Sequence, residues 1–436
     1  MDSFDSGKSR PLEWRQRQLT GIIRFCFNRR QEILAALRDD LGKPTREAVA
    51  ADIGASIIEA VTLKMNLRKW AKRERVSTPF PLLPANSYIE KEPFGVVLII
   101  GAWNYPLQLT LLPLAGAVAA GNCAIIKPSE VAPRTSELLS RVLPDFIDSD
   151  CIRVVEGGPD VTSQLLQEPF DYIFYTGSGA IGKIVMRAAA ERLIPVTLEL
   201  GGKSPCLVDR DISIQVAAKR IALGKWMNAG QTCIAPDYVL VHQQAEGRLL
   251  EALRGTIQSF YGNNPQKSPN YARIVNKKHF DRISKFLKDG KVVIGGESDP
   301  KDCYIAPTVI RVTDGNAPVM QEEVFGPLLP VMAVRDMEEA IAFVRSRPKP
   351  LALYLFSNNT DVQQRVIAKT SAGGVCINHT VLHAGNPNLP FGGVGASGIG
   401  AYHGRRTFET FTHRKPVLEK PVFPDFSFMY PKEKSD

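Results

Sequence analysis

The sequence has few cysteines for its length and no long apolar run. Seven cysteines are scattered over 436 residues and no Cys-x-x-Cys pair occurs, so we expect neither a disulfide framework nor a metal site such as a zinc site. No apolar segment approaches the ~18 residues that span a bilayer. The N-terminal residues also lack the apolar core of a secretion signal. These absences predict a cytoplasmic protein with no transmembrane segment.

The chain is basic, but its charge is not arranged for nucleic acid. The formal net charge is +9, yet Lys and Arg are spread along the chain and no nucleic-acid-binding signature is present. We therefore expect no nucleic-acid partner, while contact with an anionic membrane surface or an acidic protein stays open. The balance of 44% hydrophobic and 23% charged residues is typical of a folded globular protein, and the length predicts two or more domains.

Segments that suit buried strands alternate with helical patterns through residues 95–200. This alternation predicts a doubly wound parallel α/β sheet, and such sheets bind ligands at the carboxyl ends of their strands. Single amphipathic helices are expected over 14–41 and 48–70, and a second α/β segment begins at 201, whereas 416–436 show no periodicity. The strands expected in the first sheet are 96–100, 123–127, 152–155, 172–176 and 196–200.

Cys233 lies in the stretch GKWMNAGQTCIAP, residues 224–236, directly after an apolar helical run. A thiol just past a helix-to-loop junction, among small residues, is open to a substrate and is a candidate nucleophile. The alternative is a structural cysteine, because free cysteine is among the most buried residue types. The local sequence leaves both interpretations open.

Residues 177–182 read G-x-G-x-x-G between an expected strand and an expected helix. Glycines allow the backbone to approach a pyrophosphate, and the helix N-terminus offers N–H groups, so the pattern predicts dinucleotide binding. Glu199 lies near the spacing of a ribose ligand in this motif. A general base for water and a carboxylate paired with lysine are the other interpretations, and the sequence does not decide among them.

Three further groups of residues close expected strands or turns. Lys127 and Glu130 could hold a ribose diol between them, and Glu323 with Phe325 could meet a second ribose and a nicotinamide ring. Asn104 could donate its amide N–H to a developing oxyanion. Each group has a simpler interpretation as a turn or a surface ion pair.

Together these stretches resemble the aldehyde dehydrogenase superfamily. The motifs that carry the resemblance occur in that family's order: PFGVVLIIGAWNYP, IIKPSE, YTGS, LELGGKSP, NAGQTC, EEVFGP and LPFGGVGASGIG. Details such as GQTCIAPDYVL and YHGRRTFETFTH are most similar to the class 3 branch, which includes fatty aldehyde dehydrogenases. The resemblance spans about residues 18–413 and implies two doubly wound parallel-sheet domains plus a small bridging and oligomerisation element.

The resemblance implies a domain division and a role for each matching position. Residues 1–200 would bind the dinucleotide, with an oligomerisation hairpin near 80–95; 201–375 would be catalytic; and 376–436 would be a bridging segment and tail. Cys233 would be the nucleophile, Glu199 the general base and Asn104 an oxyanion donor. The implied cofactor-binding residues are Trp103, Lys127, Glu130, Thr176, Gly177, Ser178, Gly182, Glu323 and Phe325, and the implied substrate contacts are Tyr105, Thr232 and Ile234.

The implied function is NAD(P)-dependent oxidation of apolar aldehydes, medium or long aliphatic or aromatic, to carboxylic acids. The reaction would pass through a cysteine thiohemiacetal and thioester in a homodimer without metal. Glu130 should repel a 2′-phosphate, which favours NAD, with NADP possible. The aromatic segment 422–430 is expected to pack on a partner subunit or to touch a membrane surface. The alternatives are a coenzyme A-acylating aldehyde dehydrogenase, in which a thiol resolves the thioester, and a non-catalytic binding or structural protein on the same fold.

Overall fold

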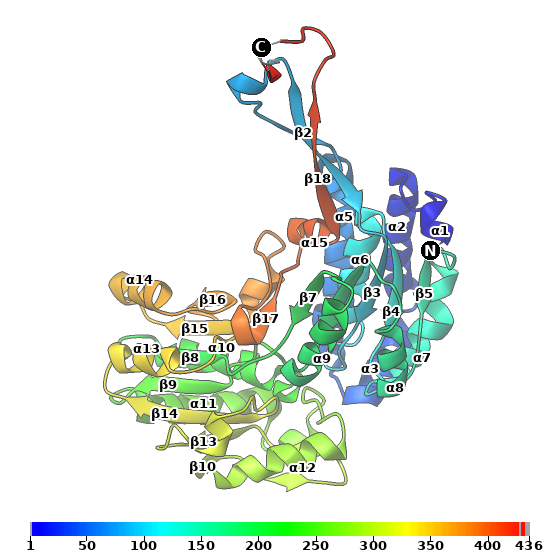
Figure 1. Cartoon of the computed structure of the whole chain (residues 1–436). Helices are drawn as coiled ribbons and strands as arrows, with labels where there is room; N and C mark the ends of the chain where they lie inside the picture. Colours follow the sequence, from blue (N-terminus) through cyan, green and yellow to red (C-terminus); the bar gives the residue numbers. More distant parts are fainter. Residues whose placement is uncertain (1, 427–428, 432–436) are drawn as a thin grey trace.

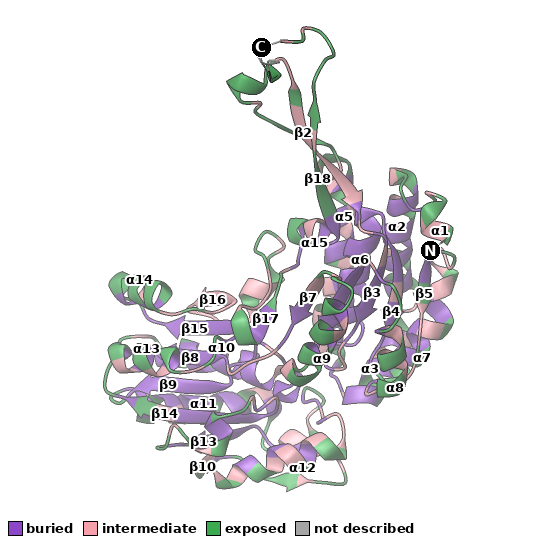
Figure 2. Ribbon diagram, in the orientation of Figure 1, coloured by how far each residue is buried: buried purple, intermediate pink, exposed green. Residues whose placement is uncertain are grey.

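The computed structural model describes residues 2–426 and 429–431 and contains two large α/β sheets (Figure 1). The first sheet has six strands in the order β17-β7-β6-β3-β4-β5, and every neighbouring pair is parallel except β17 with β7. The central strands are buried, which explains their continuous apolar sequence (Figure 2). The strands are β3 (Val96–Ile100), β4 (Cys123–Lys127), β5 (Ile152–Val154), β6 (Tyr172–Thr176), β7 (Val196–Glu199) and β17 (Gly398–Ile399).

Helices cover this sheet, and those of the N-terminal region pack around α6, which is buried along nearly its whole length. The sequence predicted one helix over 14–41 and one over 48–70, and both predictions are partly wrong. The first helix is interrupted at Arg29, and residues 48–54 form a π-helical turn. The helices are α1 (Asp2–Asp5), α2 (Leu12–Asn28), α3 (Arg30–Leu41), α4 (Thr45–Glu47), α5 (Ala55–Trp70), α6 (Gln108–Ala120), α7 (Pro133–Val142), α8 (Pro159–Leu165) and α9 (Gly179–Ala190).

The second sheet has seven strands in the order β10-β13-β14-β9-β8-β15-β16, and only the edge strand β10 is antiparallel to its neighbour. Its strands are β8 (Pro205–Val208), β9 (Tyr238–His242), β10 (Lys291–Ile294), β13 (Thr308–Arg311), β14 (Leu328–Val334), β15 (Ala352–Phe356) and β16 (Gly374–Ile377). The accompanying helices are α10 (Ile214–Trp226), α11 (Glu246–Tyr261), α12 (Lys277–Lys285), α13 (Met337–Arg345) and α14 (Thr360–Lys369), and β11 (Ser298–Asp299) pairs with β12 (Tyr304–Ile305). The doubly wound α/β prediction is confirmed.

A third, three-stranded antiparallel sheet forms an arm that projects from the body (Figure 1). Its strands are β1 (Glu74–Val76), β2 (Asn86–Pro93) and β18 (Thr412–Glu419), and β2 lies in the middle. The prediction that 416–436 lack periodic structure is wrong for 416–419, which continue β18 directly after α15 (Arg405–Thr410). That strand pairs with residues over 300 positions earlier in the sequence, so local pattern did not reveal it. The domain limits at 200 and 375 stay predictions.

Gly116 in α6 provides a test of this packing. A Cβ at position 116 would lie 2.2 Å from Thr407 Cγ2, on α15. We expect Gly116→Val to lower the thermal unfolding midpoint, because overpacking typically costs ~1–3 kcal/mol. The control is Gly255→Ala in α11, where an added Cβ meets nothing within 4 Å and helix propensity favours Ala by ~1 kcal/mol. Equal shifts in the two variants, measured by circular dichroism, would contradict the close contact of α6 with α15.

Candidate active site

The candidate residues of the first sheet lie at the carboxyl ends of its parallel strands. Asn104 follows β3, Lys127 ends β4, and Thr176 ends β6 beside Glu199, which ends β7. Parallel strands present their carboxyl ends at one edge of a sheet, so strand topology brings these residues to the same edge.

Cys233 follows α10 on a loop with an unusual backbone. Asn228 and Ala229 both have left-handed φ values, 53° and 51°, which non-glycine residues rarely adopt. Gln231 fastens the loop, because its Nε2 donates to Arg273 O at 2.8 Å and its Oε1 accepts the N–H of Val275 at 2.9 Å. The Gln of the GQTC motif therefore shapes the loop that presents the cysteine.

Hydrogen bonds tie Asn104 to the loop that carries Cys233, here called the nucleophile loop (residues 228–233). Asn104 Nδ2 donates to Gln231 O at 3.0 Å, and Asn228 Nδ2 donates to Asn104 O at 2.9 Å. The hydroxyls of Tyr105 and Thr232 lie 2.7 Å apart. Asn104 is 3% exposed, and a primary amide has a second N–H to offer. The structure thus brings together the predicted oxyanion donor and the loop of the predicted nucleophile.

Cys233 is a half-buried residue, and no cation is among the groups that shift the pKa of its thiol. Burial raises the pKa of the Cys233 thiol to about 12, and the carboxyl groups of Glu323 and Glu199 raise it further, against the backbone N–H groups of Cys233 and Ile234. The thiol is therefore neutral at rest, and a base must take its proton before it can act as a nucleophile.

Glu199 is buried, and neither of its carboxyl oxygens has a hydrogen-bond partner among the described residues. Burial raises the pKa of Glu199 well above its ordinary value. The lysine-paired interpretation of Glu199 is wrong, because Lys203 forms its ion pair with Asp237. A carboxyl group held neutral without a protein partner can exchange a proton with water or substrate.

Glu323 and Phe325 lie on the segment before β14 of the second sheet, and the Glu323 carboxyl group acts on the Cys233 thiol. A Cβ at Gly201 would lie 2.2 Å from Glu323 Oε2, so only glycine admits the carboxyl group there. Burial is the main cause that raises the pKa of Glu323 to about 8. The ring of Phe325 meets Trp103 edge-on at 5.3 Å between centroids, which joins the two halves of the site.

The β6–α9 turn has the features of a phosphate-binding turn. A Cβ at Gly177 would lie 2.2 Å from Tyr175 Oη, and one at Gly182 would lie 2.8 Å from Leu200 Cδ2. Ser178 caps α9 by accepting the N–H of Ile181. Thr176 Oγ1 is buried without a partner among the described residues. Two strands away, Lys127 Nζ lies 2.7 Å from Glu130 Oε2. These residues fit a dinucleotide along the sheet edge.

A cluster of aromatic rings and histidines near Cys233 was not identified from the sequence. The rings of Phe391 and His403 stack at 4.9 Å, Tyr402 meets His403 at 4.4 Å, and Tyr354 donates its hydroxyl to Ile234 O. Burial lowers the pKa of His383 and of His403 to about 4, so both are neutral. The segments lie more than 100 residues from Cys233 in sequence, and only the aromatic content of LPFGG and YHG signalled them.

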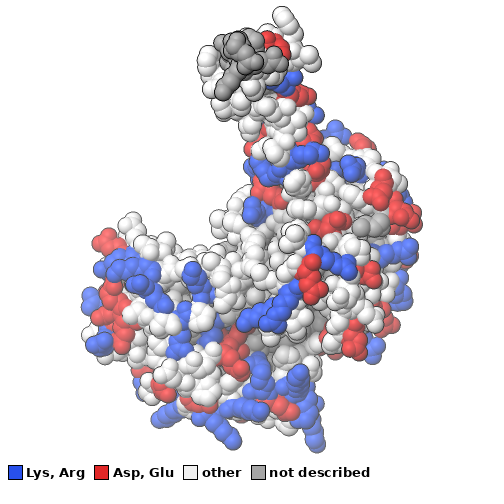
Figure 3. Space-filling model, viewed as in Figure 1, with Lys and Arg blue, Asp and Glu red and all other residues white. Residues whose placement is uncertain are grey.

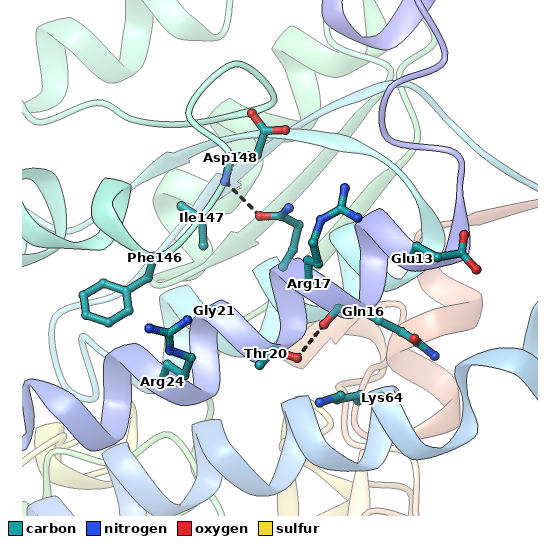
Figure 4. Close-up of a pocket in the computed structure, with 11 residues that line it drawn as sticks. Glu13, Gln16, Arg17, Thr20, Gly21, Arg24, Lys64, Phe146, Ile147 and Asp148 are labelled. Atoms are coloured by element: carbon teal, nitrogen blue, oxygen red, sulfur yellow. Dashed lines mark hydrogen bonds between the residues drawn. The ribbon is translucent and has the colours of Figure 1, made fainter.

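Cavities are found both at this site and away from it. One of about 540 Å³ is bordered by Glu323, Gly201, Gly202 and Lys203. Another, of about 600 Å³, lies against α2 and is lined by Arg17, Arg24, Lys64, Phe146 and other residues (Figure 4). The cavity against α2 contains none of the predicted site residues.

Known proteins with similar sequences and folds are aldehyde dehydrogenases. The family model described as "Aldehyde dehydrogenase family" matches residues 2–417. Human "Aldehyde dehydrogenase family 3 member B1" is 51% identical over 96% of this chain and 89% of its own length. "Aldehyde dehydrogenase, dimeric NADP-preferring" of Rattus norvegicus is 48% identical over 97% of this chain and 93% of its own. The solved structure "Substrate bound state of Staphylococcus Aureus AldH" has a TM-score of 0.97 and 46% identity, covering 99% and 95% of the two chains.

The chain belongs to the aldehyde dehydrogenase family. It is an oxidoreductase that oxidises aldehydes, and the class 3 resemblance noted in the sequence is confirmed. The comparisons support a nicotinamide dinucleotide as cofactor. Among the described residues, no helix has the length and apolar character needed to cross a membrane.

The state of Glu199 gives a test based on stability. Because its pKa is raised in the folded protein, the wild type should lose stability relative to Glu199→Gln as pH rises above 4.5, the ordinary value for the unfolded chain. We expect the unfolding midpoint of Glu199→Gln to exceed that of the wild type by more at pH 8 than at pH 5. Glu168→Gln, at an exposed carboxylate, is the control. A difference that is independent of pH would contradict a neutral Glu199.

Proposed function

We propose that the protein oxidises apolar aldehydes to carboxylic acids through a covalent acyl-enzyme, with a nicotinamide dinucleotide as the hydride acceptor. The residues that carry the reaction are Cys233, Asn104 and Glu199. The observation that carries this proposal is the pair of hydrogen bonds that fixes Asn104 against the nucleophile loop. A coenzyme A-acylating enzyme would not need a base for water, and the buried Glu199 carboxyl without a protein partner favours hydrolysis.

Attack requires that the Cys233 thiol lose its proton, since its pKa of about 12 leaves little thiolate. Glu323 and Glu199 are the carboxyl groups that act on this thiol, and either can take the proton in its ionised form. The thiolate adds to the aldehyde carbon and forms a thiohemiacetal. Asn104 Nδ2–H and the backbone N–H of Cys233 stabilise the oxyanion, and one such donor is typically worth ~3 kcal/mol.

The dinucleotide, when bound, supplies the hydride acceptor, and the chain's residues hold it beside Cys233. Lys127 and Glu130 would hold the adenosine ribose. The β6–α9 turn, with Thr176, Gly177, Ser178 and Gly182, would lie along the pyrophosphate, and Trp103, Glu323 and Phe325 would surround the nicotinamide riboside. Loss of hydride converts the thiohemiacetal to a thioester. Glu199 then takes a proton from water, which attacks the thioester and releases the acid.

The substrate end of the site is apolar and aromatic. Tyr105, Thr232 and Ile234 flank the cysteine, and the neutral His383 and His403 extend the aromatic wall. Neutral rings favour an uncharged carbon chain or aromatic group over a charged one. We expect medium- and long-chain aliphatic and aromatic aldehydes to be better substrates than charged ones, in a panel assayed by nicotinamide reduction.

NAD is the first choice of cofactor and NADP the second. Glu130 is half-exposed and would face a 2′-phosphate, but the Lys127 ammonium lies 2.7 Å from it and offsets part of the repulsion. The name of the rat relative includes NADP-preferring, which supports NADP as a second cofactor beside NAD. Glu130→Gln should therefore raise kcat/KM for NADP relative to NAD. An unchanged ratio would contradict contact of Glu130 with the ribose.

Cys233→Ala tests the assignment of the nucleophile. We expect turnover to be abolished while the dissociation constant of NAD changes less than about twofold, because the thiol serves chemistry and not cofactor binding. Nicotinamide absorbance measures the first and protein fluorescence titration the second. Cys233→Ser is the matched control for size. Retained turnover, or lost NAD affinity with Cys233→Ala, would mean that Cys233 is structural.

A homodimer is proposed from one free strand edge, that of β16, and from the exposed arm. Within the arm, β2 pairs with β1 over Ser87–Ile89 and with β18 over Asn86–Pro93. Among the described strands, β16 ends the second sheet and offers one side to a partner strand. The upper part of the arm shows few charged side chains (Figure 3), and its apolar residues include Phe80, Val422 and Phe423. The name of the rat relative includes the word dimeric, which supports the proposal of a homodimer. A cytoplasmic location also stays a prediction.

Truncation after Glu419 tests the role of the tail, of which residues 427–428 and 432–436 lie outside the described structure. We expect the dimer to weaken in light scattering, because apolar residues of the tail would pack on the partner subunit. Binding to anionic vesicles should stay unchanged. Lost vesicle binding with an unchanged dimer would favour a membrane role instead, and no change in either would contradict both.

A further inference from the structure

The segment 43–52 lies directly behind the candidate active site. It comprises the α3–α4 connection, α4 and the start of the π-helical turn. Lys43 Nζ donates to Asn104 O at 2.9 Å and to Asp52 Oδ2 at 2.8 Å, and both side chains of this ion pair are fully buried. The same ammonium lies 4.1 Å from the centre of the Tyr105 ring. One side chain of this segment therefore fixes the backbone of the oxyanion donor.

A second side chain of the segment reaches the nucleophile loop. Glu47 Oε2 accepts the backbone N–H of Asn228 at 2.9 Å. Asn228 is the first of the two left-handed residues, and its own side chain donates to Asn104 O at 2.9 Å and to Gln231 O at 3.1 Å. Glu47 thus holds the residue that links the oxyanion donor to the loop of the cysteine.

The position of Glu47 is unfavourable for a carboxylate. Burial raises the pKa of Glu47 to about 7, although the Asn228 N–H and the Lys43 ammonium oppose the shift. A carboxyl group in such a place is a candidate for a functional role. Glu47 accepts the backbone N–H of Asn228, which has a left-handed conformation that is uncommon for a non-glycine residue. Such conformations persist only where surrounding groups hold them, so holding this turn is a role for Glu47.

We propose that Glu47 is a positioning residue that sets the distance between the Asn104 amide and the Cys233 sulfur. It does so by holding the left-handed Asn228–Ala229 turn from outside the two sheets. The inference rests on the proposed function, since it needs Cys233 as nucleophile and Asn104 as oxyanion donor. Glu47 does not belong to the motifs that carry the family resemblance, and sequence reasoning did not select it.

The test compares three variants. Glu47→Ala removes the acceptor, and we expect kcat to fall about 10- to 100-fold, because a misplacement of about 1 Å can cost 10²-fold in rate. Glu47→Gln keeps an amide oxygen that can accept the Asn228 N–H, so kcat should recover to within about fivefold of the wild type. Arg46→Ala, at the exposed neighbouring position, is the control and should leave kcat unchanged. The dissociation constant of NAD should stay constant in all three.

A second measurement separates positioning from folding. The thermal unfolding midpoint and the rate of Cys233 alkylation by iodoacetamide are recorded without aldehyde or nucleotide. Slower or faster alkylation of folded Glu47→Ala, with recovery in Glu47→Gln, supports positioning. Wild-type kcat in Glu47→Ala overturns the inference, and so does a variant that fails to fold, since Glu47 would then act on the fold. A different result would contradict the proposed function, namely turnover by Cys233→Ala, so the two failures can be told apart.

Discussion

The hydrogen bond from Asn104 Nδ2 to Gln231 O joins the two halves of the candidate active site. Asn104 and Glu199 come from the edge of the first sheet, whereas Cys233 and Glu323 come from loops of the second. Neither sheet carries a complete site. Oxyanion stabilisation depends on donors fixed before the reaction begins, so a site divided between two sheets needs contacts that hold them in register. The Trp103–Phe325 ring contact and the Asn228 amide serve the same end.

The second constraint is electrostatic. The thiol of Cys233 and the carboxyl groups of Glu199 and Glu323 all have raised pKa values, and in each case burial is the first cause. The ionised forms are therefore scarce, and charge appears at the site when a proton moves between neighbours. Raised carboxyl pKa values bring a general base toward the pH at which the enzyme works. The side chains of Tyr402 and His403 are also buried, which is consistent with the proposed uncharged substrate.

Sequence reasoning predicted the parts of the site that lie on short, regular segments. Strand ends placed Asn104, Lys127, Thr176 and Glu199 at one edge because parallel strands share a direction, and the structure agrees. It failed where the cause is not local. β18 pairs with a strand in the first quarter of the chain, the break at Arg29 has no proline or glycine to mark it, and the His403 cluster assembles from separate loops. Glu47 accepts the backbone N–H of Asn228. Every non-proline residue has such an N–H, so the contact requires no particular residue at position 228 and no sequence motif reveals it.

The central claim is that an acyl group resides on Cys233 and leaves by water that Glu199 activates. Mass spectrometry of Glu199→Gln, mixed with an apolar aldehyde and NAD and quenched in acid, tests it most directly. The account predicts that the protein gains the mass of the acyl group, on the peptide that contains Cys233, and that the wild type retains far less. An unmodified Cys233 peptide despite nicotinamide reduction, or an acyl group on another residue, would contradict it.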